Sequence, residues 1–298
     1  MTGADGTGAH GAARDGIVVV DKPSGRTSHD VVARVRRLAG TRRVGHAGTL
    51  DPMATGVLVI GVDRATRLLG HLAAHDKEYA ATIRLGVTTV SDDADGEVMD
   101  TTDASHVTDR QIAAGVAALT GAIEQVPSAV SAIKVGGVRS YARVRAGEDV
   151  ALPARSVVVD AFDVLARRGD ELDVRVACTT GTYIRALARD LGRALGVGAH
   201  LTALRRTRSG AFTIDEAHAL EALEQSFQVV PLRDAVARCF PRADLAADAA
   251  RDLRYGRPVP VTGHPGAVGA FDASTGDVLG LVEDAGDVAK PVVVFAPA

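Results

Sequence analysis

Hydrophobic residues recur along this chain with two different periods. Short β-branched or alternating apolar runs predict strands at residues 16–20, 57–60, 79–85 and 172–178. Apolar residues spaced three and four apart predict helices at residues 27–40, 64–73, 108–119 and 182–195. Because these strands and helices follow no regular βαβ rhythm, the pattern predicts an α+β fold in which helices flank a mixed β-sheet core.

Two of these helices have candidate N-terminal caps. Thr27 followed by Asp30 is typical of a capping box, and Gly40 is typical of a left-handed helix end. Thr182 is the candidate N-cap of the last helix, which places Arg185 in the first turn. A cation there opposes the helix dipole at a cost of about 0.3–1 kcal/mol. We expect a buried carboxylate to compensate, although an exposed arginine tolerated at this small cost fits the spacing too.

The pattern of apolar residues changes after about residue 231. Four short β-rich segments follow, separated by Gly, Pro and Asp turns, at 259–261, 268–271, 278–282 and 292–295. This spacing predicts a small β domain, which we place at 240–298. A main domain is expected at 16–230, with a basic, Gly-containing excursion at 127–155. Residues 1–15 have no apolar stretch and are predicted to be a disordered leader rather than a signal peptide.

Composition excludes several classes of protein. The 298 residues are 46% hydrophobic and 24% charged, which is ordinary for a globular chain. Aromatic residues make up only 3%, too few for a broad base-stacking surface. No apolar run approaches the about 20 residues that cross a bilayer, and Cys178 and Cys239 are too few for a disulfide framework. The sequence therefore predicts a soluble cytoplasmic protein and, without an extended interface stripe, a monomer.

The net charge of −3 at pH 7 conceals local clusters of basic residues, at 22–43, 134–145 and 205–208. Salt confines electrostatic fields to about 8–10 Å, so a near-neutral protein with such clusters can still bind phosphates. For residues 34–37 alone, a solvated helix face is an equally good interpretation. The candidate phosphate contacts are Lys22, Arg42, Arg43, Lys134, Arg139, Arg205 and Arg206.

Conventional metal and nucleotide motifs are each incomplete. Residues 40–47 have the glycine spacing of a phosphate loop but lack its Lys-Ser/Thr pair. His71 and His75 are four residues apart but lack the Glu of a zinc protease. The calcium-like segment at 91–96 has Thr102 at its twelfth position instead of a carboxylate. We therefore expect no metal and no cofactor, and a plain turn at 91–96.

The loop at residues 43–56 is a candidate site. Its three glycines allow tight turns and close approach to another molecule. Asp51 precedes Pro52, whose ring disfavours helical dihedrals at Asp51 and so restricts the direction of its side chain. An Asp-Pro pair in a glycine-rich loop is usually only a turn, and most loop histidines such as His46 are solvated. The loop alone does not establish a catalytic site.

Seven collinear segments between about Gly16 and Ala219 carry a stronger signal. They read DKPSGRTSHD, GHAGTLDPMATGVL, KEYAATIRLG, SDDADGE, VPSAVSAIKVGG, GTYIRALARDLG and GAHLTALRRTRSG. Together they resemble the TruB family of bacterial tRNA pseudouridine-55 synthases. The resemblance implies a pseudouridine-synthase-like core, a thumb-like RNA-binding insertion at 127–155 and a PUA-like C-terminal β domain, here divergent and acidic.

The resemblance also implies an activity. Family members isomerise the T-loop uridine of tRNA, position 55, by breaking its N-glycosidic bond and rejoining the ring through carbon. The implied partner is the T-arm stem-loop of tRNA, with no cofactor and no obligate protein partner. Asp51 matches the catalytic aspartate, which must be ionised to act as nucleophile or base. Because a guanidinium favours an ionised carboxylate, we assign Arg185 as its partner.

The remaining implied residues handle a uridine that is flipped out of the RNA, at a cost of a few kcal/mol. Tyr79 matches the tyrosine that stacks on the flipped base, and such stacking contributes about 1–3 kcal/mol. The same tyrosine can also handle a proton during the rearrangement. His46 matches the residue that enters the vacated position. Tyr183 and Leu204 match positions that shape the uridine pocket.

Two alternatives stay open. A catalytically silent tRNA-binding or RNA-chaperone protein on the same scaffold would not need Asp51, Tyr79 and Arg185, yet all three are present. A hydrolase of glycosidic bonds would need a water-activating group or a metal, for which no motif matches. The sequence also leaves open whether Asp51 attacks the sugar C1′, attacks the base or abstracts a sugar proton.

Overall fold

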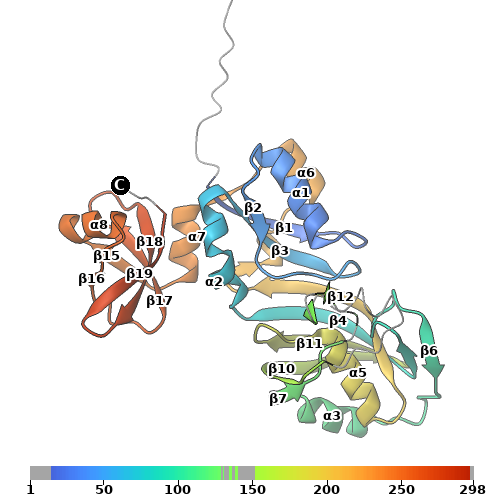
Figure 1. Cartoon of the computed structure of the whole chain (residues 1–298). Coiled ribbons are helices and arrows are strands. Elements are labelled where there is room, and N and C mark those ends of the chain that lie inside the picture. Colours follow the sequence, from blue (N-terminus) through green and yellow to red (C-terminus); the bar gives the residue numbers. More distant parts are fainter. Residues whose placement is uncertain (1–14, 129, 131–133, 136–137, 140–151, 296–298) are drawn as a thin grey trace, which may run out of the picture.

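A ten-stranded sheet lies at the centre of the computed structural model, which describes residues 15–128, 130, 134–135, 138–139 and 152–295 (Figure 1). Its main path runs β14 (Val230–Pro231), β1 (Gly16–Lys22), β3 (Thr55–Val62), β12 (Ala199–Ser209), β4 (Lys77–Leu85), β11 (Glu171–Cys178), β10 (Arg155–Arg168), β7 (Gly121–Gln125). Two short strands pair beside this path, β2 (Val44–His46) with β3 and β13 (Phe212–Thr213) with β12. Strands β12 and β3 are parallel, whereas the other pairs in this sheet are antiparallel.

One face of this sheet is covered by helices that bury their apolar sides on it. They are α1 (Ser28–Ala39), α3 (Asp109–Ala118), α5 (Ile184–Ala194) and α6 (Leu220–Gln225). In β1, Val18 and Val20 join the core on this face, while Ile17 and Val19 join the core on the opposite face. This alternation follows from the two-residue period of a strand, and it makes β1 buried on both sides.

The opposite face holds the 3₁₀ helix η1 (Asp63–Leu68), α2 (Leu69–Ala73) and α7 (Leu232–Cys239). Helix α7 lies between the large sheet and a second, C-terminal sheet (Figure 1). Phe271 and Leu281 of the second sheet share one hydrophobic cluster with Ile17 and Val236. The two sheets are therefore packed through a common core.

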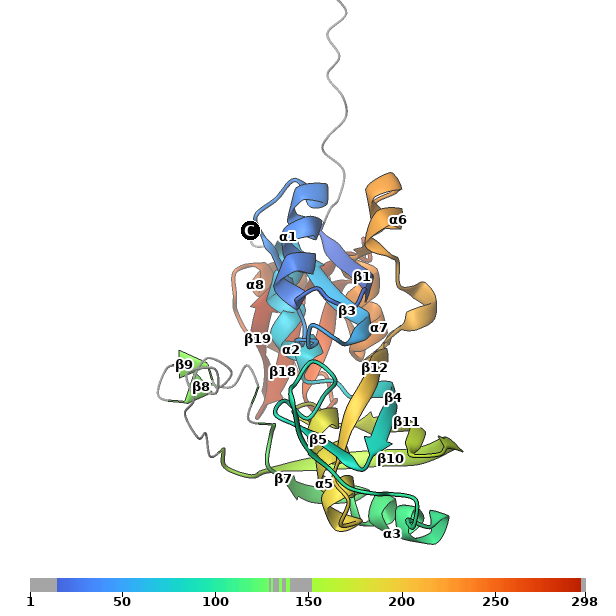
Figure 2. The ribbon, with the colours of Figure 1, turned by 90° about the vertical axis from the view of Figure 1, so that its right-hand side faces the viewer.

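The second sheet has its own smaller core against α8 (Ala247–Arg254). Its strand order is β15 (Arg242–Leu245), β17 (Ala267–Asp272), β18 (Val278–Ala285), β19 (Val288–Val294), β16 (Val259–Pro260). The remaining elements are η2 (Ile214–Glu216) and two hairpins, β5 (Val87–Thr89) with β6 (Val98–Thr101) and β8 (Lys134–Val135) with β9 (Val138–Arg139). Figure 2 shows the β8–β9 hairpin standing away from the large sheet.

The predicted α+β class, with a mixed sheet, flanking helices and a C-terminal β unit, is confirmed. The capping box of Thr27 and Asp30 and the left-handed Gly40 are present. Thr182 is not the cap of α5: the N-cap residue is Tyr183, and the Thr182 hydroxyl donates to the Thr179 carbonyl instead. Arg185 still lies in the first turn.

Two expectations fall largely outside the described residues. The predicted leader at 1–15 does so except for its last residue, and so does most of the predicted insertion at 127–155. Within the described ranges, no helix is long and apolar enough to cross a membrane.

Candidate active site

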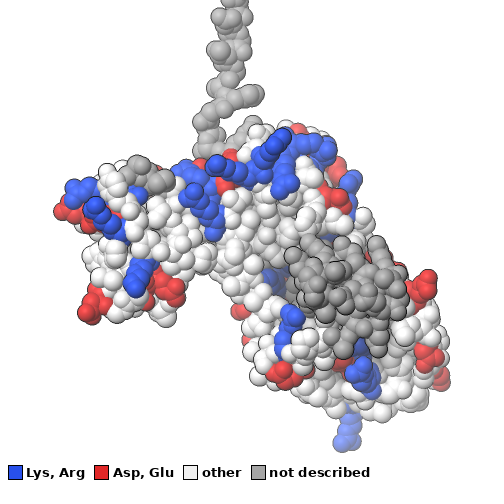
Figure 3. All heavy atoms as spheres, viewed as in Figure 1, with Lys and Arg blue, Asp and Glu red and all other residues white. Residues whose placement is uncertain are grey.

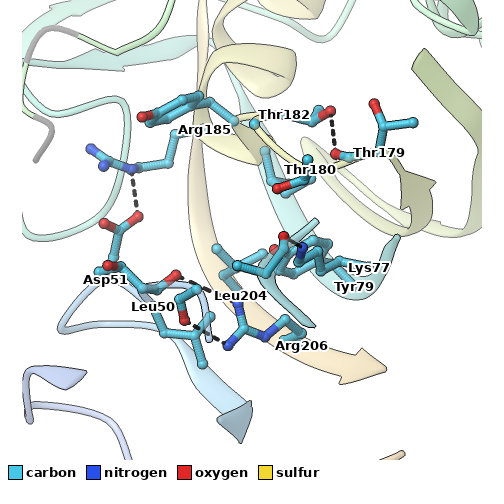
Figure 4. Close-up of a pocket in the computed structure, with 16 residues that line it drawn as sticks. Leu50, Asp51, Lys77, Tyr79, Thr179, Thr180, Thr182, Arg185, Leu204 and Arg206 are labelled. Carbon is cyan, nitrogen blue, oxygen red and sulfur yellow. Dashed lines mark hydrogen bonds and ion pairs between the residues drawn. The ribbon is translucent and has the colours of Figure 1, made fainter. Parts of the chain in front are cut away.

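A cavity of about 360 Å³ opens between β4, β12, the loop after β2 and the turn that precedes α5 (Figure 4). Its volume lies within the range of small-molecule sites, about 300–1,000 Å³. Five of the six residues assigned from the sequence to catalysis or to the uridine pocket line it, namely Asp51, Tyr79, Tyr183, Arg185 and Leu204. The cavity therefore gathers residues that are up to about 150 positions apart in the chain because the sheet brings their strands and loops together.

Asp51 and Arg185 form an ion pair at this cavity. The Arg185 Nε donates to the Asp51 Oδ2 at 2.9 Å. The Arg185 side chain is only 4% exposed, whereas the Asp51 side chain is 35% exposed. The guanidinium is thus held inside the protein, and the carboxylate remains open to a ligand. The carboxylate partner predicted for the Arg185 guanidinium is present, although Asp51 is only partly buried.

A second carboxylate shares the same guanidinium. The Arg185 Nη1 lies 3.4 Å from the Asp93 Oδ2, and it donates to the carbonyl oxygens of Ser91 and Val130 at 2.8 and 2.9 Å. Asp93 is buried. The sequence interpretation of 91–96 as a plain turn missed this contact, since nothing in the local pattern indicates that a turn aspartate is buried. The fixed guanidinium gives the Asp51 carboxylate a partner in one defined place.

The backbone around Asp51 is fixed on both sides by side chains. Ser28 Oγ accepts from the Leu50 N–H at 2.9 Å and donates to the Leu50 carbonyl at 3.1 Å. Lys22 Nζ donates to the Pro52 carbonyl at 3.1 Å, and Arg206 Nη2 donates to the Gly48 carbonyl at 3.1 Å. Three residues of the Asp51 loop, Gly48, Leu50 and Pro52, are therefore held, so the Asp51 side chain is preorganised.

Lys22 and Arg206 are not the surface phosphate contacts that the sequence predicted. Lys22 is fully buried and Arg206 is 1% exposed. The ammonium of Lys22 donates to the carbonyls of Pro23, Arg26 and Pro52, and burial lowers its pKa to about 8. Basic residues in a sequence cluster indicate charge, but burial depends on carbonyls brought from elsewhere in the fold. The prediction was wrong for these two residues.

Of the other five predicted phosphate contacts, three have side chains that the structure describes and two do not. Arg42 and Arg43 are exposed, and Arg205 has a side chain 41% exposed that pairs with Asp21 at 2.7 Å. Figure 3 shows basic side chains along the upper edge of the molecule, over α1 and the 3₁₀ helix η1 that precedes α2. The side chains of Lys134 and Arg139 lie outside the described part of the chain.

Tyr79 and Tyr183 form parts of the cavity wall on different elements. Tyr79 lies on β4, and burial raises the pKa of its hydroxyl while the nearby Arg206 charge opposes that rise. Tyr183 is the N-cap residue of α5, and its backbone N–H and carbonyl are both bonded to the side chain of the buried Gln125, at 2.8 and 3.1 Å. Gln125 was not predicted, because a glutamine carries no sequence signal for this role.

His46 lies outside the cavity lining. It is half-buried on β2 and makes an edge-to-face contact with His29, with ring centroids 5.6 Å apart. Burial is the main reason that the pKa of His46 is lowered, and the charge of His29 adds to it. The lowered pKa favours the neutral form of the His46 imidazole.

Comparisons with known proteins identify the family of the chain. Residues 36–184 match the model of the TruB family pseudouridylate synthase N-terminal domain. The chain belongs to the TruB family. Residues 185–236 match the tRNA pseudouridylate synthase B C-terminal domain, and residues 240–296 match the tRNA pseudouridine synthase II C-terminal domain.

Relatives of this TruB-family chain include proteins named tRNA pseudouridine synthase B. The one from Thermobifida fusca (strain YX) is 57% identical over 290 residues, which cover 95% of this chain and 99% of that protein. The one from Nocardia farcinica (strain IFM 10152) is 57% identical over 287 residues, which cover 95% of this chain and 94% of that protein. These similarities extend over nearly the whole of each protein.

Solved structures with the same fold include a chain from a Cbf5-Nop10-Gar1 complex. It has a TM-score of 0.74 and 27% identity, covering 95% of this chain and 86% of that one. A chain from an H/ACA RNP bound to a substrate RNA containing 2′-deoxyuridine has a TM-score of 0.71 and 26% identity, covering 95% of this chain and 85% of that one. Both support the assignment of the fold.

Proposed function

We propose that this chain isomerises the T-loop uridine of tRNA, position 55, to pseudouridine. It acts in the cytoplasm, as a monomer and without an obligate protein partner. The observation that carries the proposal is the ion pair of Asp51 and Arg185 at a cavity that also contains Tyr79. Family membership and relatives named tRNA pseudouridine synthase B support the same activity.

The reaction breaks the bond between C1′ and N1 of the uridine and forms a bond between C1′ and C5. The hydrogen on C5 is lost as a proton and N1 takes up a proton, so the reaction is an isomerisation without net oxidation or reduction. An ionised carboxylate at the sugar or the base can act as nucleophile or base in this rearrangement. Asp51 supplies that carboxylate, and Arg185 fixes its position through a charge-assisted hydrogen bond.

The uridine must leave its stacked position to reach Asp51. Flipping costs a few kcal/mol, and stacking on one aromatic ring returns about 1–3 kcal/mol. Tyr79 and Tyr183 line the cavity, Leu204 adds an apolar surface, and His46 lies on the neighbouring strand β2. We assign Tyr79 to the face of the flipped base and His46 to the space that the base leaves.

Tyr79→Leu should lower the single-turnover rate by about 100-fold while changing the tRNA dissociation constant by less than about fivefold. A leucine keeps the apolar volume but removes the ring and its hydroxyl. The flipped base is then no longer held in position for reaction, so the rate falls more than the affinity for tRNA. Rapid-quench assays and filter binding measure the two quantities. An affinity loss as large as the rate loss would make Tyr79 a docking residue.

Binding of tRNA should weaken steeply as salt rises, because phosphate contacts release counterions. We assign these contacts to the exposed arginines Arg42, Arg43 and Arg205, together with Lys134 and Arg139. Arg42→Gln combined with Arg43→Gln should reduce the slope of log affinity against log salt by about 1–2. Filter binding between low and moderate salt measures the slope. A flat line for the unsubstituted chain would refute the assignment.

The proposed function is tested by incubating the chain with an unmodified T-arm stem-loop. Pseudouridine is then mapped by carbodiimide labelling and primer extension. We expect one modified position, in the loop. Tight binding without any modified position would instead favour a catalytically silent tRNA-binding protein.

A further inference from the structure

Arg206 is a buried cation that lines the cavity, and the proposed mechanism assigns it no role. Its guanidinium is 1% exposed, and within the described ranges it has no carboxylate partner. Its donors reach three backbone carbonyls instead: Nε to Val57 at 2.7 Å, Nη2 to Gly48 at 3.1 Å and Nη1 towards Thr49 at 3.5 Å. One side chain thereby connects strand β3 to the loop that carries Asp51.

Stability alone gives a poor account of this arrangement. Burying a charged group is costly unless it is paired, and backbone carbonyls offset this cost less completely than a carboxylate would. A guanidinium does offer a planar fork of donors that can hold several acceptors in one fixed geometry, which a lysine ammonium cannot reproduce. A residue selected for holding backbone in place fits these contacts better than one selected for packing.

The backbone of Arg206 fixes the far end of the same loop. In β12, Arg206 is the register partner of Gly56 on β3 and of Tyr79 on β4. Gly56 has a φ of +99°, and a Cβ there would lie 2.2 Å from the Arg206 carbonyl oxygen. The loop from Gly48 to Gly56 is therefore anchored at its start by the Arg206 side chain and at its end by the Arg206 backbone.

The same residue also faces the tyrosine that we assign to the base. The Arg206 charge acts on the Tyr79 hydroxyl, and Figure 4 shows the Arg206 side chain on the same side of the cavity as Tyr79 and Leu50, opposite Arg185. Asp51 is thus held from two directions, by Arg185 at its carboxylate and by Arg206 at the backbone three residues before it.

We propose that Arg206 is a positioning residue for the isomerisation. It sets the distance between the Asp51 carboxylate on its loop and the Tyr79 ring on β4. It does so through the Gly48 and Thr49 carbonyls, without touching the reacting atoms. The inference rests on the proposed function, because it concerns the geometry of that reaction.

The test compares Arg206→Lys and Arg206→Met with the unsubstituted chain in three measurements. These are the single-turnover rate of pseudouridine formation, the tRNA dissociation constant and the melting temperature. We expect Arg206→Met to lower the rate by about 100-fold and Arg206→Lys by about tenfold, since small misplacements of a reacting group cost rates of this order. The dissociation constant should stay within about threefold, because Arg206 presents no exposed donor to the RNA.

Arg238→Lys is the matched control. Arg238 also bonds a backbone carbonyl, that of Ala211, and it pairs with Glu216 away from the cavity. We expect its rate to stay within about twofold of the unsubstituted chain. If Arg206→Met does not fold, Arg206→Lys decides the question, because it retains the charge.

Two results would overturn the proposal: a rate for Arg206→Lys within about threefold of the unsubstituted rate, or a loss of tRNA affinity as large as the loss of rate. Neither can be confused with failure of the proposed function. If the proposed function were wrong, the unsubstituted chain itself would form no pseudouridine.

Discussion

Replacing Asp51 with asparagine should abolish pseudouridine formation, with a loss of at least about 10³-fold, while tRNA binding stays nearly unchanged. An amide cannot ionise, so it cannot serve as nucleophile or base. The amide oxygen can still accept from the Arg185 Nε, which in the unsubstituted chain donates to the Asp51 Oδ2. The loop contacts of Ser28, Lys22 and Arg206 do not involve the Asp51 side chain and should persist.

The measurement for this variant is single-turnover product formation with enzyme in excess, alongside filter binding of the same tRNA. Asp244→Asn is a matched control, because Asp244 also pairs with an arginine, Arg242, but in the C-terminal sheet. The control should retain its rate. Turnover by Asp51→Asn at more than about a tenth of the unsubstituted rate would reject Asp51 as the catalytic carboxylate.

Arg185→Lys should have the second large effect, a loss of at least about 100-fold in the single-turnover rate. The guanidinium serves Asp51, Asp93 and the carbonyls of Ser91 and Val130 at once. An ammonium keeps the charge but cannot span these acceptors. Lysine is preferable to methionine for the test because removing one partner of a buried ion pair costs about 3–5 kcal/mol, which threatens folding.

The control for this experiment lies one turn further along α5. Arg189 pairs with Asp92 and Asp190 and donates to the Val126 carbonyl, but it is not part of the cavity. Arg189→Lys should therefore change the rate by less than about threefold. Equal losses for the two variants would show that α5 needs its arginines for folding rather than for catalysis.

The elements with local signals could be predicted from the sequence. The capping box of Thr27 and Asp30, the left-handed Gly40 and the two-residue alternation in β11 each follow from neighbouring residues. The placement of Arg185 in the first turn of α5 suggested a carboxylate partner, and the structure provides Asp51 and Asp93. The predicted N-cap of α5, Thr182, is one residue too early. A threonine beside the true N-cap residue can donate to a nearby carbonyl instead of capping the helix.

Burial could not be predicted for charged residues. Lys22, Arg206 and Asp93 each appear in polar, apparently exposed segments, yet each is enclosed by groups distant in sequence. The carbonyl of Pro52 reaches Lys22 across 30 positions, and the carbonyl of Gly48 reaches Arg206 across 158. Such contacts depend on the arrangement of β1, β3 and β12 in the sheet, which no local pattern specifies.

The central claim is that Asp51 drives the replacement of the C1′–N1 bond of a tRNA uridine by a C1′–C5 bond. A tRNA transcript carrying tritium at C5 of its uracil rings tests it most directly, since forming the new bond expels the C5 hydrogen. We predict release of one equivalent of tritium per tRNA, none from a transcript with the T-loop uridine replaced, and none with Asp51→Asn. Release of free uracil, or no release of tritium from tRNA that the chain binds, would contradict the account.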